Sequence, residues 1–265
     1  MCIDLTTLKD PPPLVPSWIP ALGLSVEDKN TLLSGKKLHD THIAAAQKII
    51  KQQFPYVDGL EDTVVLSNND IPCPATQEAV QIHHVPDHWV MSCSFGGSVA
   101  VYDSANTTLT PPLRRQIAQV YRPLATGPEK IIPVKVRRCQ KQIGGKDCGL
   151  FAIANTIALI NGVDPATVKF QQAKMRKHLQ QCLESGFFTM FPHMANDPKS
   201  HTNRSRNDVV SLNCLCKNHH PGAKTFQCKS CKVNYHLMCV KPSAVNKLRL
   251  TANTSNNELC PKCKV

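Results

Sequence analysis

The feature that most constrains how this chain can fold is a set of closely paired cysteines, with one histidine, near its end. Seven of the thirteen cysteines lie in the last fifty-odd residues. Thiolate and imidazole ligands in four short-spaced pairs are what two tetrahedral zinc sites require. So short a segment, with few large apolar residues, can hardly build a core without metal. We therefore expect two structural Zn²⁺ ions, the alternatives being a coincidental cysteine-rich tail or disulfides. The eight expected ligands are Cys214, Cys216, Cys228, Cys231, His236, Cys239, Cys260 and Cys263.

The charge of the chain is concentrated in the same tail. Residues 197–265 carry 12 Lys and Arg against 3 Asp and Glu, a net charge of +9 out of +12 for the whole chain. Seven metal-bound thiolates and two Zn²⁺ ions would reduce this value to about +6. Such a basic surface suits nucleic acid or an acidic protein as partner. A solvated face that only aids solubility is an equal alternative.

The remaining composition predicts a soluble protein of the cytosol or nucleus. No stretch approaches the roughly 18 apolar residues of a membrane span. The first residues include Asp4 and no apolar core long enough for a signal peptide. Structural disulfides are rare in these compartments, which favours metal binding or catalysis as the role of the cysteines. The basic tail favours the nucleus.

Sequence patterns divide the chain into four parts. Residues 1–24 are rich in proline and are expected to be extended. Residues 25–195 form the main domain. Residues 196–210 contain little that could be buried and are expected to be a polar linker. Residues 211–265 contain the expected metal ligands.

The main domain combines helices with strands, which predicts an α+β fold. "SVED" from residue 25 is typical of a helix N-terminus, with Gly35 as its end. Asp40 is expected to cap a second helix that closes at Pro55. "FGG" at 95–97 is expected to be a turn between two strands. The expected strands cover 63–66, 79–85, 88–95, 98–104 and 131–136, and further helices cover 149–162 and 173–184.

One cysteine outside the tail, Cys148, stands at the start of an apolar run, "GLFAIANTIALING". A helix N-terminus stabilises a thiolate through its unpaired amides, so this position favours a nucleophile. Glycines at 144, 145 and 149 would let the backbone approach a substrate, and the Gln142 amide could donate to an oxyanion. A buried structural cysteine is the alternative.

Earlier in the chain, a histidine and an aspartate provide the partners that a nucleophilic thiol needs. His88 opens one expected strand and Asp103 closes the next. If these strands pair antiparallel, both residues come to the same end of the hairpin. Cysteine, histidine and an orienting acid are the requirement for thiol-based acyl transfer. His83 and His84 are rival bases without a matching acid, and we expect both on a polar face.

This arrangement resembles the Ulp/SENP-type cysteine peptidases, which cleave SUMO and related ubiquitin-like modifiers after a Gly-Gly tail. The resemblance rests on "HW" at 88–89, an aspartate after a hairpin, and "Q-x5-C-G" leading into an apolar helix, and it extends over about residues 25–195. It implies a papain-like α+β peptidase domain with His88 as base, Asp103 as its orienting acid, Gln142 as oxyanion donor and Cys148 as nucleophile.

The resemblance also implies how a substrate would bind. Trp89 matches the family tryptophan that lies over the slender Gly-Gly tail, and Gly145 would lie along the same substrate. The family often has "W-L-x-D" before its first major helix, where this chain has "KLHD" with Lys37 in place of the aromatic residue. Leu38 and Asp40 remain. In the family the Gly-Gly tail lies in a narrow tunnel beneath the tryptophan. Because Lys37 replaces an aromatic residue, the sequence does not settle what forms the other wall of such a tunnel here, or whether SUMO is preferred over another modifier.

The order of ligands in the tail resembles a PHD finger. The family pairing interleaves, with Cys214, Cys216, His236 and Cys239 on one zinc and the other four cysteines on the second. A RING-type ligase shares this cross-brace but usually has its histidine earlier. Many PHD fingers bind histone tails. Here Phe226 has basic neighbours and Glu258 replaces a common tryptophan, which disfavours methyl-lysine binding.

The sequence thus predicts a thiol peptidase or isopeptidase for SUMO or a related modifier, targeted by a two-zinc finger that binds a histone tail, an acidic protein or nucleic acid. A catalytically inactive modifier-binding protein with a chromatin-binding or nucleic-acid-binding finger is the alternative, and Lys37 is its best support. A zinc-dependent ligase is a third and weaker interpretation.

Overall fold

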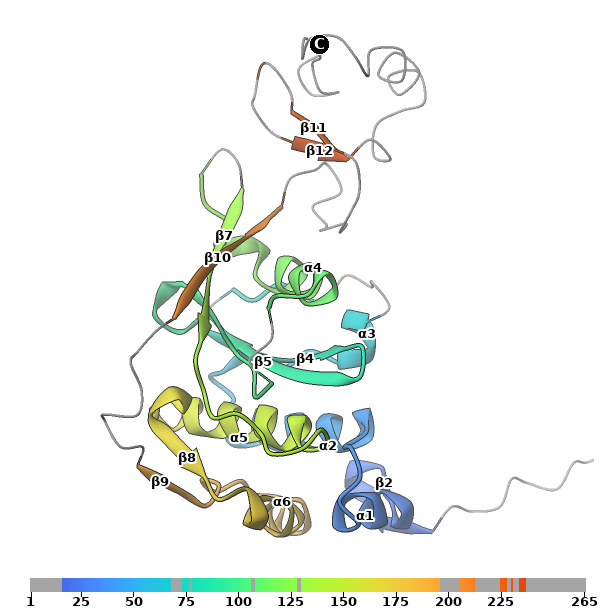
Figure 1. The fold of residues 1–265 in the computed structure, drawn as a ribbon. Coiled ribbons are helices and arrows are strands. Elements are labelled where there is room, and N and C mark those ends of the chain that lie inside the picture. Colours follow the sequence, from blue (N-terminus) through green and yellow to red (C-terminus); the bar gives the residue numbers. More distant parts are fainter. Residues whose placement is uncertain are drawn as a thin grey trace, which may run out of the picture.

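The computed structural model describes residues 16–67, 73–76, 78–105, 108–127, 130–195, 205–212, 225–227, 230 and 234–236. Within these ranges no helix combines the length and the apolar character needed to cross a membrane. Figure 1 shows a mixed sheet with helices on both faces.

The central sheet has six strands in the order β10-β7-β6-β5-β4-β3. The pairs β10–β7, β6–β5 and β5–β4 are antiparallel, whereas β7–β6 and β4–β3 are parallel. The antiparallel pairing of β5 with β6 that the sequence predicted is confirmed. The strands are β3 (Asp58–Gly59), β4 (Ala79–Val85), β5 (His88–Cys93), β6 (Val99–Tyr102), β7 (Ile131–Arg137) and β10 (Arg206–Ser211).

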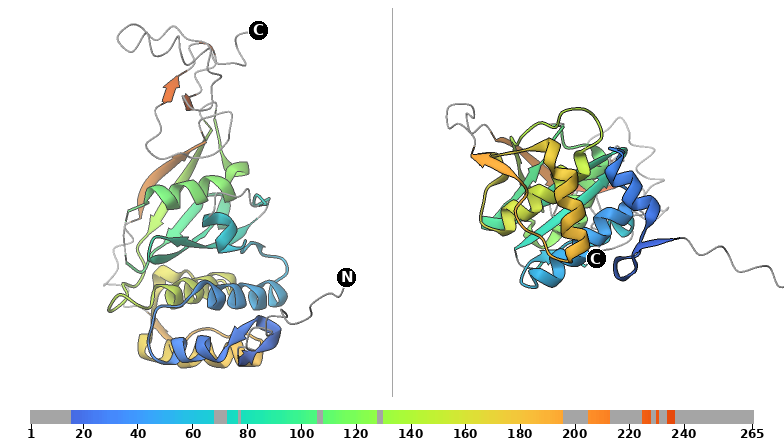
Figure 2. Two further views of the ribbon diagram at one scale, coloured as in Figure 1. Left: turned by 90° about the vertical axis from the view of Figure 1, so that its right-hand side faces the viewer. Right: turned by 90° about the horizontal axis from the view of Figure 1, so that it is seen from below.

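Helices cover the sheet in unequal layers (Figure 2). On one face lie α2 (Asp40–Gln53) and α5 (Cys148–Ile160), and beyond them lie α1 (Val26–Leu33) and α6 (Gln172–Ser185). The opposite face carries α3 (Thr63–Ser67) and α4 (Pro111–Val120). Each face therefore has its own apolar core, the larger one around α5.

Short ribbons and single turns complete the described part. The ribbons pair β1 (Ser17–Ile19) with β2 (Leu24–Ser25), β8 (Val168–Phe170) with β9 (His193–Ala195), and β11 (Thr225–Gln227) with β12 (Asn234–His236). The turns are η1 (Pro20–Leu22), η2 (Phe95–Gly97), η3 (Arg122–Leu124) and η4 (Pro165–Thr167).

Several predicted elements are confirmed. Helix α1 begins at the predicted N-cap, where Ser25 and Asp28 form a capping box. Helix α5 and helix α6 cover the predicted segments 149–162 and 173–184 to within two residues at each end. Helix α2 also forms, but its N-cap is His39 and not Asp40, which is the first helical residue.

Two predicted boundaries of the main domain differ from the structure. The fold begins before residue 25, because Trp18, Ile19 and Leu22 already pack against the larger core. The predicted linker over 196–210 is too long at its end, because residues 206–211 form β10 at the edge of the sheet. There Val210 is buried and the Arg114 guanidinium bonds to the Asp208 carboxylate at 2.6 Å.

The predicted strand over 63–66 is wrong, because these residues form helix α3. The Asp62 carboxylate accepts the backbone N–H of Val64 at 2.7 Å, as an N-cap does. Leu66 is then fully buried in the smaller core. Capping and burial together override the strand preference of the β-branched residues in "TVVL".

Candidate active site

Cys148 is the first residue of α5, with Asp147 as N-cap. All but one residue of this helix are buried, so the helix is held rigidly between the sheet and its neighbours. The thiol is therefore fixed at the positive end of a helix dipole. Cys148 exposes only 1% of its surface, so little more than a slender segment can approach it.

The hairpin of β5 and β6 brings His88 and Asp103 together. The His88 Nε2 and Asp103 Oδ1 atoms are 2.7 Å apart. The same carboxylate oxygen accepts the backbone N–H of Ala105 at 2.8 Å, which fixes its orientation. Since Nε2 of His88 faces Asp103, its Nδ1 is the nitrogen left for the Cys148 thiol, to which the ring is hydrogen-bonded.

The electrostatics of the site favour an ion pair between thiolate and imidazolium. Burial works against both charges, but hydrogen bonds to Asp103 and Cys148 raise the pKa of His88 above its ordinary value. Burial alone would raise the pKa of Cys148. Hydrogen bonds from His88 and from the backbone N–H groups of Trp89 and Gly149 outweigh burial, so the pKa of the thiol is lowered. Such a thiol is a stronger nucleophile near neutral pH than a free cysteine.

Gln142 is anchored to Ser104, the residue that follows Asp103. Its backbone N–H donates to the Ser104 carbonyl at 2.9 Å, and the Ser104 hydroxyl donates to its Oε1 at 2.7 Å. Because Oε1 is held in this way, the amide NH2 faces the loop that leads to Cys148, and it donates to the Gly144 carbonyl at 2.9 Å. Its role as oxyanion donor stays a prediction.

Trp89 is buried and packs tightly beside the start of α5. Its indole N–H donates to the Leu38 carbonyl at 3.1 Å. A Cβ at Gly149 would lie 3.1 Å from Leu38 Cβ and 3.3 Å from Trp89 Cδ1. The glycine at 149 is therefore needed for packing, whereas Gly145 is exposed and has open space around it. Substrate contacts of Trp89 and Gly145 stay predictions.

The rival histidines have other surroundings. His84 is exposed, as predicted, and its ring stacks on Trp89 at 4.4 Å between centroids. His83 does not lie on a polar face, because it is fully buried on β4. Its Nδ1 bonds to Gln116 Oε1 at 3.0 Å and its Nε2 to Ser92 Oγ at 2.6 Å. Both ring nitrogens are satisfied, so His83 is a structural residue.

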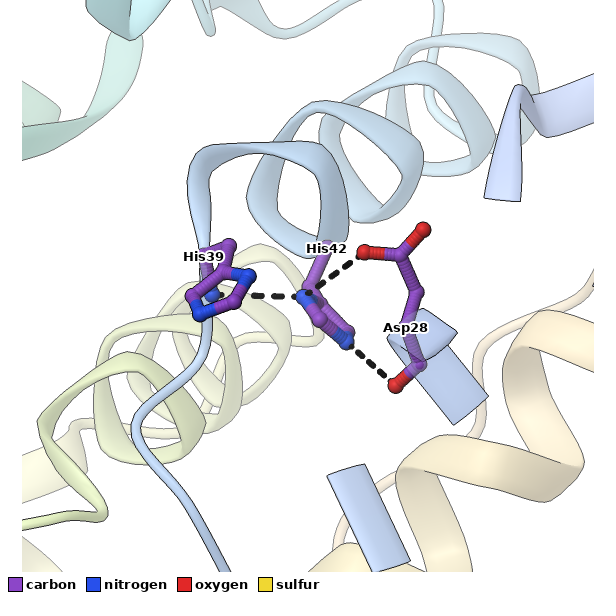
Figure 3. Close-up of side chains that lie close together, drawn as sticks. All are labelled: Asp28, His39 and His42. Atoms are coloured by element: carbon purple, nitrogen blue, oxygen red, sulfur yellow. Dashed lines mark hydrogen bonds and ion pairs between the residues drawn. The ribbon is translucent and has the colours of Figure 1, made fainter. Parts of the chain in front are cut away.

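A cluster that the sequence did not indicate joins α1 to α2 (Figure 3). Ligand atoms of Asp28, His39 and His42 lie within 4.8 Å of one another. However, His42 Nδ1 accepts the backbone N–H of His39 at 3.2 Å, and its Nε2 donates to the Asp28 carbonyl at 2.9 Å. Neither nitrogen of His42 has a lone pair for a metal. The cluster of Asp28, His39 and His42 is therefore a structural hydrogen-bonded contact between α1 and α2, which we call the latch.

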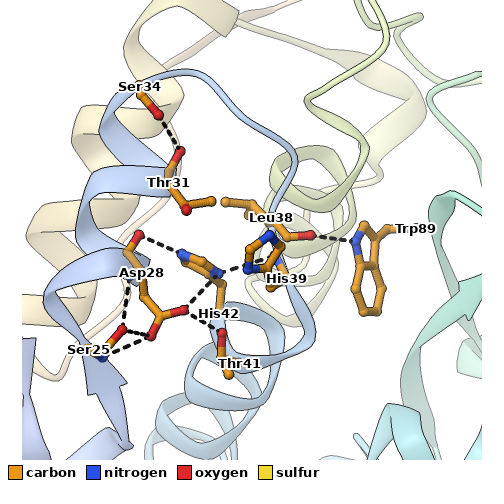
Figure 4. A network of polar contacts seen from close by, with 9 residues as sticks. All are labelled: Ser25, Asp28, Thr31, Ser34, Leu38, His39, Thr41, His42 and Trp89. Carbon is orange, nitrogen blue, oxygen red and sulfur yellow. Dashed lines mark hydrogen bonds and ion pairs between the residues drawn. The ribbon is translucent and has the colours of Figure 1, made fainter. Parts of the chain in front are cut away.

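The latch continues to the catalytic side of the molecule (Figure 4). His42 fixes the backbone at His39, and the preceding residue, Leu38, holds the Trp89 indole. Asp28 also bonds to Thr41 and to Ser25. Hydrogen bonds to the two neighbouring residues Leu38 and His39 thus connect Trp89 with the contact between α1 and α2. The pattern "HDTH" at 39–42 was the only sequence signal for it.

Of the predicted zinc ligands, the seven cysteines of the tail lie outside the described residues. His236 is described: it lies on β12 opposite Thr225 and is buried, with 5% of its surface exposed. The assignment of His236 as a zinc ligand stays a prediction. Phe226 lies on β11, opposite Tyr235.

Comparison of the sequence with protein-family models and with curated proteins gives no match. The fold does match solved structures. The SUMO protease Ulp1 with its catalytic cysteine oxidised to a sulfinic acid gives a TM-score of 0.50 at 15% identity, over 62% of this chain and 85% of that chain. The chain has the fold of the Ulp1 protease domain.

Further solved structures align over similar lengths. The Ulp1 domain in complex with Smt3, the yeast ortholog of SUMO, gives a TM-score of 0.48 at 14% identity, over 62% of this chain and 83% of that chain. The Xanthomonas campestris effector XopD bound to ubiquitin gives a TM-score of 0.40 at 13% identity, over 55% of this chain and 91% of that chain. At such identities the likeness concerns the fold alone.

Proposed function

We propose that the chain is a thiol-dependent peptidase or isopeptidase that cleaves after the Gly-Gly tail of SUMO or a related ubiquitin-like modifier. The observation that carries the proposal is the position of His88, bonded on one side to Asp103 and on the other to Cys148. The fold supports it, because the protein that shares this fold is named as a SUMO protease.

The geometry supports a two-step acyl transfer. The Cys148 thiolate attacks the carbonyl carbon of the last glycine of the modifier. The carbon–nitrogen bond then breaks, His88 gives its proton to the leaving amine, and a thioester remains. Water attacks the thioester while His88 takes a proton from it, which releases the modifier carboxylate and the thiol. Asp103 keeps the imidazole oriented throughout.

The surroundings of Cys148 support a substrate without side chains. Cys148 is nearly covered, and Leu38 and Trp89 lie close against Gly149, the next residue, where even a Cβ would be 3.1–3.3 Å from them. An extended Gly-Gly segment is the narrowest that a protein can offer. Lys37 stands where the related peptidases often have an aromatic residue, and its ammonium donates to the Asp87 carbonyl at 3.2 Å. This position therefore offers no aromatic ring to cover the substrate. The proposed substrate class therefore includes related modifiers beside SUMO.

We further propose that the tail binds two Zn²⁺ ions in a PHD-like finger that places the peptidase near its conjugates. The ligand spacing and the buried His236 support this assignment. The net positive charge of the tail supports an acidic protein or nucleic acid as its partner and the nucleus as its location. A histone tail is proposed as a partner only on the resemblance to PHD fingers.

The test is cleavage of SUMO and ubiquitin fusions that carry a short extension after Gly-Gly. The zinc-loaded full chain should release the extension, whereas Cys148→Ser and His88→Ala should abolish release and keep the fold. Cys73→Ser is the matched control, because Cys73 is an exposed cysteine outside the site. Near-normal turnover by either active-site variant would refute the mechanism. Binding of a modifier without cleavage would favour the inactive binding protein.

A further inference from the structure

The loop from Gln142 to Asp147 is held from outside the catalytic triad, by the first turns of α6. The side chain of Gln172 bonds to both backbone groups of Ile143: its Oε1 accepts the N–H at 2.9 Å, and its Nε2 donates to the carbonyl at 2.9 Å. The second hydrogen of the same NH2 group goes to Asp147 Oδ2 at 2.6 Å. One amide side chain thus fixes both ends of this loop.

Arg176, one turn further along α6, holds the other oxygen of the same carboxylate. One terminal nitrogen of its guanidinium donates to Asp147 Oδ1 at 2.5 Å, and the other donates to the Leu32 carbonyl at 2.8 Å, near the end of α1. Both charged side chains are about five-sixths buried. The carboxylate that precedes Cys148 is therefore tied to α1 as well as to α6.

Because of these contacts, the Asp147 side chain does not cap α5. An aspartate at an N-cap ordinarily accepts the amides of the first helical turn. Asp147 makes no such side-chain bond to α5, because both of its oxygens are turned toward α6. The first amides of α5 thus remain directed at the thiol and at the place where an oxyanion would form, and the Gly149 amide does bond to Cys148.

The loop itself has few other supports. Gln142 is anchored to Ser104, but residues 143–146 are exposed, and Gly144 has a positive φ of 77°. The Ile143 side chain is 81% exposed, so the backbone bonds to Gln172, and not side-chain burial, keep Ile143 in place. Loss of Gln172 would therefore free the segment between the proposed oxyanion donor and the nucleophile.

We propose that Gln172 and Arg176 are positioning residues of the active site, which hold the loop 142–147 in place and draw the Asp147 carboxylate away from the amides of α5. The inference rests on the proposed function for its effect on turnover. Its effect on the Cys148 thiol does not depend on any substrate. The charged or titratable groups around that thiol are His88 from β5, Asp103 after β6, and Asp147 itself.

The test uses the full chain with three single variants. Gln172→Met keeps the length of the side chain and removes all three bonds, and Gln172→Glu keeps its shape but removes the two donated bonds. Gln171→Met is the matched control, because the Gln171 side chain makes no bond to this loop within the described residues. Cleavage of a Gly-Gly fusion and the pH profile of Cys148 alkylation, followed on its own peptide by mass spectrometry, are measured together.

We expect both Gln172 variants to lower kcat by roughly 10- to 100-fold with little change in KM. The inflection of the alkylation profile should move to higher pH, because Asp147 Oδ2 loses its partner and can accept the first amides of α5, while Arg176 still holds Oδ1. In the Gln172→Met background, Asp147→Asn should bring that inflection back toward the wild-type value. Gln171→Met should behave as the wild type.

Wild-type kcat together with a wild-type alkylation profile in Gln172→Met would overturn the inference. A variant that loses activity only through unfolding would show a lowered melting temperature and no return of the profile in the double variant, which would also overturn it. If the wild-type chain cleaves no modifier, the proposed function fails, and the alkylation profiles alone still decide the positioning role.

Discussion

His88, His83 and His42 carry the same imidazole, and their surroundings leave His83 and His42 neutral while favouring a charged His88. Hydrogen bonds to Asp103 and Cys148 outweigh burial at His88 and raise its pKa. Burial lowers the pKa of His83 to about 4 and also lowers that of His42, against the opposing bond to Asp28. Only His88 is therefore suited to carry a proton at neutral pH and deliver it to a leaving group.

At the same scale, Gly149→Ala should damage the site without touching the triad. The new Cβ would lie 3.1 Å from Leu38 and 3.3 Å from Trp89, so one of them must shift. We expect a loss of about 1–3 kcal/mol in the free energy of unfolding and a fall in turnover of roughly 10-fold. Urea unfolding and fusion cleavage measure the two effects.

Gly145→Ala is the control for the stability measurement, because a Cβ there meets nothing within 4 Å. Equal stability and turnover of Gly149→Ala and the wild type would show that the packing beside Cys148 is looser than the structure indicates.

Sequence patterns could locate the triad because its members sit at the ends of recognisable elements. His88 begins a strand, Asp103 follows the next strand, and Cys148 begins an apolar helix, so element order alone brings them together. Gln172 and His42 have no such signature. A single glutamine or histidine inside a helix is common, and its partners 25 or 14 residues away appear only in three dimensions.

At the scale of elements, buried polar groups on β4 and β5 connect the sheet to α4. The His83 ring bonds to Gln116 of α4 and to Ser92 of β5, whose hydroxyl also contacts the Tyr121 hydroxyl at 2.9 Å. The Gln116 amide donates to the His84 carbonyl at 2.7 Å. Burial of this network, rather than its hydrogen bonds, disfavours a charge on His83 and lowers the pKa of the ring to about 4.

We therefore expect acid to weaken the fold through His83. Its pKa is about 4 in the folded chain and about 6.5 when unfolded, so below pH 6.5 the unfolded chain binds the proton more tightly. The free energy of unfolding should fall by about 2 kcal/mol between pH 6.5 and pH 5 from this group. His88, with its raised pKa, stays protonated in the folded chain over this range, whereas its imidazole in the unfolded chain is only half protonated at pH 6.5. Acidification therefore adds a small stabilisation from His88, which offsets a minor part of the loss at His83.

Urea unfolding at several pH values, compared between the wild type and His83→Gln, isolates the effect. The variant should be less stable at pH 7 and should lose less stability on acidification. Parallel pH dependence of the two proteins would contradict the assignment of a buried neutral histidine.

Helix α4 shows where the sequence analysis missed an available signal. Leu113, Ile117 and Val120 recur at helical spacing after prolines at 111 and 112, a pattern typical of a helix start. Strand β10 is a different case. Its residues "RNDVVS" are mostly polar, and only pairing with β7 makes them a strand. No local pattern could separate them from a linker.

At the scale of the whole molecule, β10 makes the segment after the main domain part of the sheet. Val210 is buried against the smaller core, and the backbone N–H of Leu212 donates to the Lys130 carbonyl at 2.8 Å. Cys214, the first predicted zinc ligand, follows two residues later. The proposed finger would therefore follow directly on an edge strand of the central sheet.

A chain ending at residue 195 should consequently be less stable than one ending at residue 212. It would lose the burial of Val210 and Leu212, worth roughly 3 kcal/mol or more together, and would expose β7 as an edge strand that favours aggregation. Urea unfolding of both chains measures the difference. Equal unfolding midpoints would mean that β10 does not contribute to the stability of the main domain.

The most direct test of the central claim is covalent capture of the nucleophile. The zinc-loaded chain is incubated with SUMO, ubiquitin and related modifiers that carry a vinyl-type electrophile at the C-terminus, and the product is weighed by mass spectrometry. We predict an adduct with at least one modifier, absent from Cys148→Ala, and this result would also name the substrate class. No adduct with any modifier, from a folded protein, would contradict the peptidase and favour a modifier-binding protein.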